Sequence, residues 1–134
     1  MKADAQTEAA VLAVLDAFNT AVATGARDAV LDLFTPDPDV FLLASEAGER
    51  AIGRAELERF FSRAFARPVA FSWTWDAGIV SAAGPVAWVA LDATVHMTSE
   101  RGTQRAPYRI TAVLERRGDR WLLAQYHGSE PAPG

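Results

Sequence analysis

The chain has 134 residues, of which 50% are hydrophobic and 22% charged, and this is the composition of one globular domain with its own core. A net charge of −4 without a basic stripe argues against nucleic acid or an anionic membrane surface as a partner. The lack of cysteine excludes a disulfide framework, a thiolate metal site and a cysteine nucleophile.

The N-terminal stretch MKADAQTEAA carries acidic residues where a secretory signal needs basic and then apolar ones. The longest apolar runs, VFLLA and PVAWVAL, are too short to span a bilayer. We therefore expect a cytoplasmic protein. The excess of arginine over lysine and the abundant alanine are typical of a GC-rich bacterium.

The first half of the chain is expected to be mostly helical. Apolar residues at helical spacing predict an amphipathic helix over residues 5–24, and Gly25 follows as its C-terminal cap. A second, short helix is predicted over 26–34, where TPDPD ends it because proline cannot continue a helix. VFLLA then predicts a short strand, SEAGER a loop, and residues 53–65 a third helix.

The second half is expected to form antiparallel strands. Apolar and polar residues alternate in PVAFSWTWDAGIV and in PVAWVALDATVHM, which is typical of half-buried strands. APYRITAVLE and WLLAQYHGS flank RRGDR, which predicts a hairpin. Helices followed by a meander of strands predict an α+β fold with the helices on one face of a curved sheet.

The segments GRAELERFF, SAAGPVAWV and YRITAVLERRGDRWLLAQYHGSEP, in this order, resemble the SnoaL-like branch of the nuclear transport factor 2-like (NTF2-like) superfamily over about residues 7–131. The tail also resembles the association domain of calmodulin-dependent kinase II. The resemblance implies a cone-shaped NTF2-like fold, with about three N-terminal helices on a curved antiparallel sheet. It also implies a pocket inside the cone and a homodimer through the outer face of the sheet. We expect a single domain, 1–134, with a core over about residues 7–129 and a tail over 130–134.

Two chemistries of the superfamily can be compared with this chain residue by residue. Where ketosteroid isomerases carry an oxyanion-binding tyrosine and a proton-abstracting aspartate, this chain carries Phe18 and Leu42, with the alignment at Leu42 depending on loop length. Neither side chain can donate a hydrogen bond or exchange a proton. Where the kinase association domain has an arginine in its pocket, this chain has Ala112. Both sites are therefore changed.

The pairing of the last two strands decides which side chains face the pocket. With Gly118 and Asp119 as a two-residue loop, Ile110 opposes His127, and Gln125 and His127 point inward with Tyr108. A longer loop or a bulge shifts the register by one residue and exchanges the two faces. Arg109 would then join His127, and it is a pocket residue on that condition.

The candidate catalytic residues are accordingly His127, as acid or base, and Tyr108, as a donor to a developing oxyanion. His127 could equally be a structural histidine bonded to backbone. Gln125 would fix a polar ligand. Mostly apolar walls with a few polar groups are typical of ligand pockets. The apolar wall is expected to consist of Phe61, Trp73, Leu91 and Met97.

The outer face of the sheet is expected to be mixed polar and aromatic, and to form the homodimer through Trp88, Thr94, His96 and Tyr126. Asp92 shares this face with His96, which argues against a general-base pair inside the pocket. No metal site is expected, because the chain has only two histidines and they lie on separate strands. No cofactor is expected either.

Two functional hypotheses follow. The favoured one is a protein that binds a small apolar molecule and that could act as a cofactor-free enzyme of the cyclase, dehydratase or isomerase type, by proton transfer. The alternative is a non-catalytic dimeric module for association or ligand binding, which the changed isomerase positions favour. The residues leave open whether the protein is an enzyme.

Overall fold

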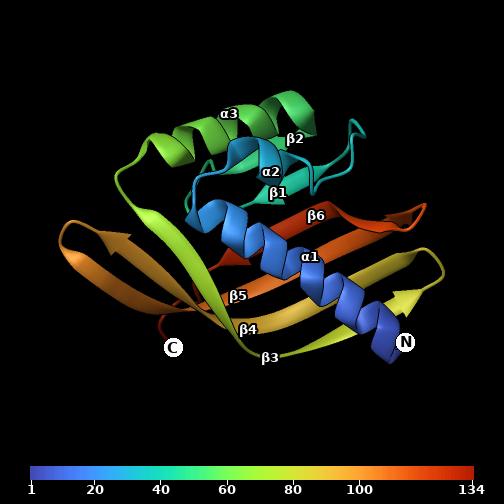
Figure 1. The fold of residues 1–134 in the computed structure, drawn as a ribbon. Coiled ribbons are helices and arrows are strands. Elements are labelled where there is room, and N and C mark those ends of the chain that lie inside the picture. The colour runs from blue at the N-terminus through green and yellow to red at the C-terminus, as the bar shows by residue number, and fades with distance from the viewer.

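The computed structural model describes all residues, 1–134. Three helices and six strands form an α+β fold in which the helices cover the concave face of one curved sheet (Figure 1). The helix α1 crosses the long strands, while α3 lies beside the short strands β1 and β2. The elements in chain order are α1 (Ala5–Ala23), α2 (Arg27–Leu31), β1 (Phe41–Leu43), β2 (Arg50–Ile52), α3 (Gly53–Ala66), β3 (Ala70–Ala83), β4 (Val86–Ser99), β5 (Gly102–Arg117) and β6 (Arg120–Ser129).

The sheet has the strand order β2-β1-β6-β5-β4-β3. All neighbouring strands are antiparallel except β1 and β6, which are parallel, so the sheet is mostly antiparallel, as predicted. The strand β2 (Arg50–Ile52) was not predicted. Its first residue, Arg50, falls in the segment SEAGER, which was predicted as a loop, and its other two residues were not assigned. Strands this short carry no periodicity that a sequence could reveal.

The first and third predicted helices, α1 and α3, form as expected. Asp4 caps α1 by accepting a hydrogen bond from the backbone N–H of Thr7 at 2.8 Å. Gly25 follows the helix with a φ of +67°, which suits glycine. The observed bounds of α1 and α3 agree with the predicted ranges within one residue.

The helix α2 is shorter than predicted and ends at Leu31 instead of residue 34. The backbone after it turns to the sheet, where Thr35 donates to the Leu123 carbonyl at 2.9 Å and Leu123 donates to the Leu33 carbonyl at 2.7 Å. Pro36 disfavours a helical conformation at Thr35 as well. The residues predicted to continue the helix therefore pair with the start of β6.

The faces of the sheet are defined by the strict alternation in β4. Its inner face, which packs under the helices, carries Val89, Leu91, Ala93 and Val95, and all four are buried. Its outer face carries Trp88 and Asp92, which are exposed. This alternation is the period-two pattern that the sequence predicted.

Two bulges change the alternation in the neighbouring strands. One lies in β3 between Trp75 and Ala77, and the other lies in β6 at Ala124, where Leu114 pairs with Leu123 but Val113 pairs with Gln125. A bulge places an extra residue on one strand and moves the following side chains to the opposite face. In β6 this brings Tyr126 and Gly128 to the inner face, opposite Ala112 and Ile110.

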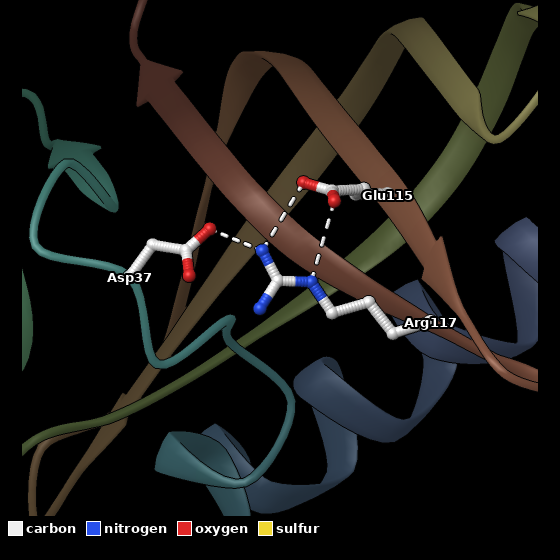
Figure 2. A network of polar contacts seen from close by, with 3 residues as sticks. All are labelled: Asp37, Glu115 and Arg117. Atoms are coloured by element: carbon white, nitrogen blue, oxygen red, sulfur yellow. Dashed lines mark hydrogen bonds and ion pairs between the residues drawn. The ribbon is translucent and has the colours of Figure 1, made fainter.

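A network of charged side chains fastens the loop after α2 to the hairpin of β5 and β6. Figure 2 shows Arg117 of β5 between Asp37 of this loop and Glu115 of its own strand. Both carboxylates raise the pKa of the Arg117 guanidinium above its ordinary value, the Asp37 hydrogen bond most. A second ion pair joins Arg120 to Asp32 at 3.0 Å. None of the helices is both long enough and apolar enough to cross a membrane.

Candidate functional site

A cavity of about 230 Å³ lies between the inner face of the sheet, α1 and α3. We call it the concave pocket. Of the 20 residues that line it, 15 are hydrophobic, and eight aromatic rings dominate its wall. These rings belong to Phe18, Phe60, Phe61, Phe65, Phe71, Trp73, Tyr108 and Tyr126. Such a surface favours an apolar occupant.

The aromatic rings hold one another in place around Phe18. The Phe18 ring stacks on the Trp73 ring with centroids 5.9 Å apart and lies 4.6 Å from the Tyr126 ring. The Tyr108 ring in turn lies 5.9 Å from the Trp73 ring. Aromatic pairs at these separations contribute about 0.5–1.5 kcal/mol each beyond the area they bury. The wall of the pocket is therefore a packed aromatic cluster contributed by α1, β3, β5 and β6.

Two polar atoms in this cluster have no hydrogen-bond partner in the protein. They are the indole Nε1 of Trp73 and the hydroxyl of Tyr126, and both are fully buried atoms. An unsatisfied buried polar group destabilises a fold by about 1–3 kcal/mol, and native proteins contain few of them. Both atoms belong to residues that line the concave pocket.

Burial keeps both tyrosines protonated. It raises the pKa of Tyr126 well above its ordinary value of 10.0, and the nearby Tyr108 raises it further. Burial also raises the pKa of Tyr108, to which Glu49 and Glu130 add, while a hydrogen bond with Ser45 lowers it. Both hydroxyls are therefore available as hydrogen-bond donors at neutral pH.

The backbone of Trp73 is fixed by a side chain of α1. Asn19 accepts a hydrogen bond from the Trp73 backbone N–H at 2.8 Å and donates one to its carbonyl at 3.1 Å. This replaces the strand neighbour that Trp73 lacks, since β3 is the edge of the sheet. One turn earlier, Asp16 accepts a hydrogen bond from the Trp75 indole at 2.9 Å. The edge strand and its tryptophans are thus held against α1.

The Tyr108 ring lies across β6 at a position that has no side chain. A methyl group added to Gly128 would lie 2.6 Å from the Tyr108 hydroxyl and 2.7 Å from Cε2, too close for either atom to stay in place. Gly128 therefore allows the Tyr108 ring its position in the pocket wall. This contact could not be predicted from local patterns, because it depends on the register of β6.

Five of the residues that line the pocket are polar or charged, and one of these is Ser45. Three carboxylates, Glu46, Glu49 and Glu130, line it together with one guanidinium, Arg67. Arg67 lies over the Phe71 ring at 5.8 Å from its centroid, and Glu49 accepts a hydrogen bond from the Glu46 backbone N–H at 2.9 Å. The charged part of the lining is thus more acidic than basic.

Four of the predicted pocket residues line the concave pocket: Tyr108, Phe61, Trp73 and Met97. Leu91 is buried on the inner face but packs against Gly78 and does not line the pocket.

The predicted register of β6 is wrong beyond Leu123. Because of the bulge, His127 pairs with Thr111 and Gln125 with Val113, and both side chains belong to the outer face. Neither lines the concave pocket. The bulge does bring Arg109 onto the face of His127, as expected for a shifted register, but that face is the outer one.

The bulge has the opposite consequence for Tyr126, which lies on the inner face instead of the predicted outer one. It was predicted on the outer face as a dimer contact, and the bulge places it inside, 4% exposed and in the pocket wall. The residue types of the strand contained a signal for this exchange. Gln125 and His127 are polar and favour the outer face, whereas the ring of Tyr126 favours a buried position. The other predicted dimer residues, Trp88, Thr94 and His96, do share the outer face of β4.

The two positions compared with ketosteroid isomerases, Phe18 and Leu42, both line the concave pocket. The apolar residues at these positions therefore shape its surface directly. Ala112 is buried on the inner face and does not line the pocket.

The family model of the SnoaL-like domain matches residues 11–133, and the chain therefore belongs to this family. No curated protein matches the chain significantly.

Several solved structures share the fold of this chain. A protein from Xanthomonas campestris, named for a calcium/calmodulin-dependent protein kinase II association domain, is 27% identical with a TM-score of 0.77 over 92% of this chain and 87% of its own. A protein named for a dehydratase of the NTF2-like family, from Streptomyces avermitilis, is 20% identical with a TM-score of 0.79 over 92% and 95%. A ketosteroid isomerase-like protein from Erwinia carotovora atroseptica is 22% identical with a TM-score of 0.74 over 93% and 96%. The last two likenesses show the fold alone.

Proposed function

We propose that this protein binds a small, largely apolar molecule in the concave pocket. The observation that carries the proposal is the cavity of about 230 Å³, whose wall consists mostly of aromatic and other apolar side chains. A pocket for a drug-sized ligand measures roughly 300–1,000 Å³, so the occupant here is smaller and has one or two rings.

A catalytic form of this proposal is cofactor-free proton transfer, of the kind that cyclases, dehydratases and isomerases carry out. Tyr108 would act as the donor to a developing oxyanion, and the base would be Glu49 or Glu130, the carboxylates that act on the Tyr108 hydroxyl. His127 is on the outer face and takes no part. The geometry supports binding more strongly than catalysis, because no carboxylate replaces the isomerase aspartate at Leu42.

A second function, homodimer formation through the outer face, is favoured by a separate observation. Large apolar side chains are exposed on this face, among them Ile79 at 55% and Trp88 at 40%. Exposed apolar patches on an otherwise soluble surface mark interaction sites. The two functions use opposite faces of the sheet and are compatible.

Titration with neutral one- and two-ring compounds, followed by tryptophan fluorescence and calorimetry, tests the binding proposal. Ala64 of α3 lines the pocket and Ala55 of the same helix is exposed. Ala64→Phe should fill the cavity and weaken binding at least about tenfold, while Ala55→Phe should bind as the wild type does. Binding that survives Ala64→Phe unchanged, or no binding of any compound by the wild type, would overturn the proposal.

A further inference from the structure

We infer that Asp92 and Arg109 set the orientation of the homodimer, in which each Asp92 forms an ion pair with Arg109 of the partner subunit. The inference rests on the proposed homodimer through the outer face and specifies how its two copies are arranged. Their two-fold axis lies in the interface and runs parallel to β4 and β5, between these two strands.

Exposed apolar side chains of the sheet are confined to its outer face. Four large hydrophobic residues of the strands are exposed: Ile52, Ile79, Val86 and Trp88. The strand register places all four on this one face. A face with this composition favours contact with another protein surface, and a second copy offers the same apolar side chains in return.

The apolar side chains of the outer face lie in a row across the sheet. Successive strand pairs join Trp88 to Val113, Val113 to Gln125, Gln125 to Phe41 and Phe41 to Ile52. We call these five residues the apolar row, since Gln125 is the only polar one among them. Four residues further along β4, another outward pair consists of Asp92 and Arg109. The face therefore has an apolar part and a charged part, which follow each other along the strands.

Asp92 and Arg109 lie directly opposite each other, near the middle of β4 and β5. On their other sides, Asp92 pairs with Ala77 and Arg109 with Ser129, and neither of these carries a charge. Both charged residues are exposed, and neither belongs to any of the four ion pairs of the chain. They border a shallow hollow of about 270 Å³, to which the small Ala77 contributes. The hollow has room for a side chain of a second copy.

The symmetry of a dimer determines which residues of the two copies meet. Every contact in a two-fold interface occurs twice, with the two residues exchanged between the copies. An axis parallel to β4 and β5 and between them exchanges the positions of these strands, so that Asp92 faces Arg109 of the partner subunit. The same axis keeps the apolar row in register with the apolar row of the second copy. Opposite charges and apolar side chains are thus matched by one and the same arrangement.

An axis perpendicular to the strands gives a different result. If it runs through the charged part of the face, Asp92 meets Asp92 of the partner subunit, and Trp88 lies against the polar pair of His96 and Arg105. Like charges in contact and apolar groups against polar ones both disfavour this orientation. The distribution of charge therefore selects the axis parallel to the strands.

Charge reversal at the two positions tests the ion pair. Asp92→Arg and Arg109→Glu each place like charges opposite each other in the homodimer, and each should weaken it at least about tenfold in sedimentation velocity. Glu58→Arg and Arg59→Glu make the same changes of charge at exposed positions of α3, on the opposite side of the sheet (Figure 1). These two controls should dimerise as the wild type does.

An equimolar mixture of Asp92→Arg and Arg109→Glu distinguishes pairing between copies from pairing within one copy. In the mixed dimer, the introduced arginine faces the introduced glutamate, and the native Arg109 of one copy faces the native Asp92 of the other. Both contacts are attractive, so the mixture should form heterodimers about as tightly as the wild type forms homodimers. Native mass spectrometry separates these species by mass. The double variant Asp92→Arg/Arg109→Glu should recover the homodimer as well.

The outcomes separate the inference from the proposed homodimer. Single variants that dimerise as tightly as the wild type, or a mixture that forms no heterodimers, would overturn the inference while the homodimer stands. A wild type that remains monomeric at micromolar concentration would overturn the homodimer, and the inference with it.

Discussion

The two faces of the sheet treat their polar groups in opposite ways. On the outer face, side chains pair across the strands: Thr74 contacts His96 at 2.7 Å and Thr94 donates to Asp76 at 3.2 Å. On the inner face, Trp73 Nε1 and the Tyr126 hydroxyl are buried without a partner. Polar side chains of the outer face thus find partners across the strands or in water, whereas the inner face contains two buried polar atoms without a partner.

The two faces also differ in the exposure of their apolar side chains. The inner face buries its apolar residues under the helices, whereas the outer face exposes Ile79, Val86 and Trp88. The two faces therefore differ in what they leave unsatisfied: buried polar atoms on the inner face and exposed apolar side chains on the outer face. This difference is consistent with the two proposed functions, ligand binding on the inner face and homodimer formation through the outer face.

The largest effect is expected from Gly78→Ala, which adds a methyl group beside Leu91 on the inner face of the sheet. The added methyl group would overlap with the Leu91 side chain and lie 2.7 Å from the Ala90 carbonyl oxygen, so the backbone must move. Overpacking of this kind typically destabilises a protein by about 1–3 kcal/mol, and contact with backbone favours the upper end. Urea denaturation measures the change.

Ala77→Ser is the matched control for this substitution. Ala77 is the neighbouring residue, is exposed and pairs with Asp92 on the outer face, where a hydroxyl should change stability by no more than about 0.5 kcal/mol. Equal stabilities of the two variants would show that the close approach at Gly78 has no energetic significance.

The next effect concerns the outer face, where Trp88→Glu should break the proposed homodimer. A carboxylate in place of the exposed indole would have to lose its hydration in an interface, and this should weaken association at least about tenfold. Sedimentation velocity at micromolar concentration would show a shift from dimer to monomer. Ala9→Glu adds the same charge on the exposed surface of α1 and should leave the dimer intact. A wild type that sediments only as a monomer would contradict the dimer itself.

The two long helices and the long strands could be predicted because their signals are local. The periodicity of residues 5–24 and the alternation in β4 are visible in the sequence, and the structure confirms both. Strict alternation along β6 could not predict the position of Tyr126, because this position follows from the bulge at Ala124, which interrupts the alternation. The one extra residue in the bulge thus turns Gln125 and His127 away from the pocket and turns Tyr126 into it.

Tyr126→Phe should stabilise the free protein by about 1 kcal/mol, because it removes a buried hydroxyl without a partner and keeps the ring. The substitution should also change the response to alkaline pH. The pKa of Tyr126 is raised in the folded state, so the unfolded chain loses its proton first and stability falls as the pH rises from about 10 toward the raised value. Tyr108 acts in the same direction.

Denaturation at a series of pH values checks this prediction. The chain has only these two tyrosines, so an ultraviolet titration of tyrosinate reports on the pocket alone. The wild type should titrate above pH 10 and lose stability there, and Tyr126→Phe should lose less. Titration of both hydroxyls at their ordinary pKa would show that they are accessible to water and would argue against a closed aromatic wall.

The smallest effect is expected for Arg117→Gln, which removes the centre of the charged network on β5. Arg117 contacts Asp37 and Glu115, but all three side chains are about a third exposed or more, and exposed ion pairs contribute little because water and salt screen them. The loss of stability should therefore be small at low salt and should disappear in concentrated salt. Arg101→Gln, which makes the same change of net charge in the turn between β4 and β5 where Arg101 has no ion pair, should show neither effect. A large loss that persists at high salt would mean that Arg117 holds the loop after α2 through packing rather than charge.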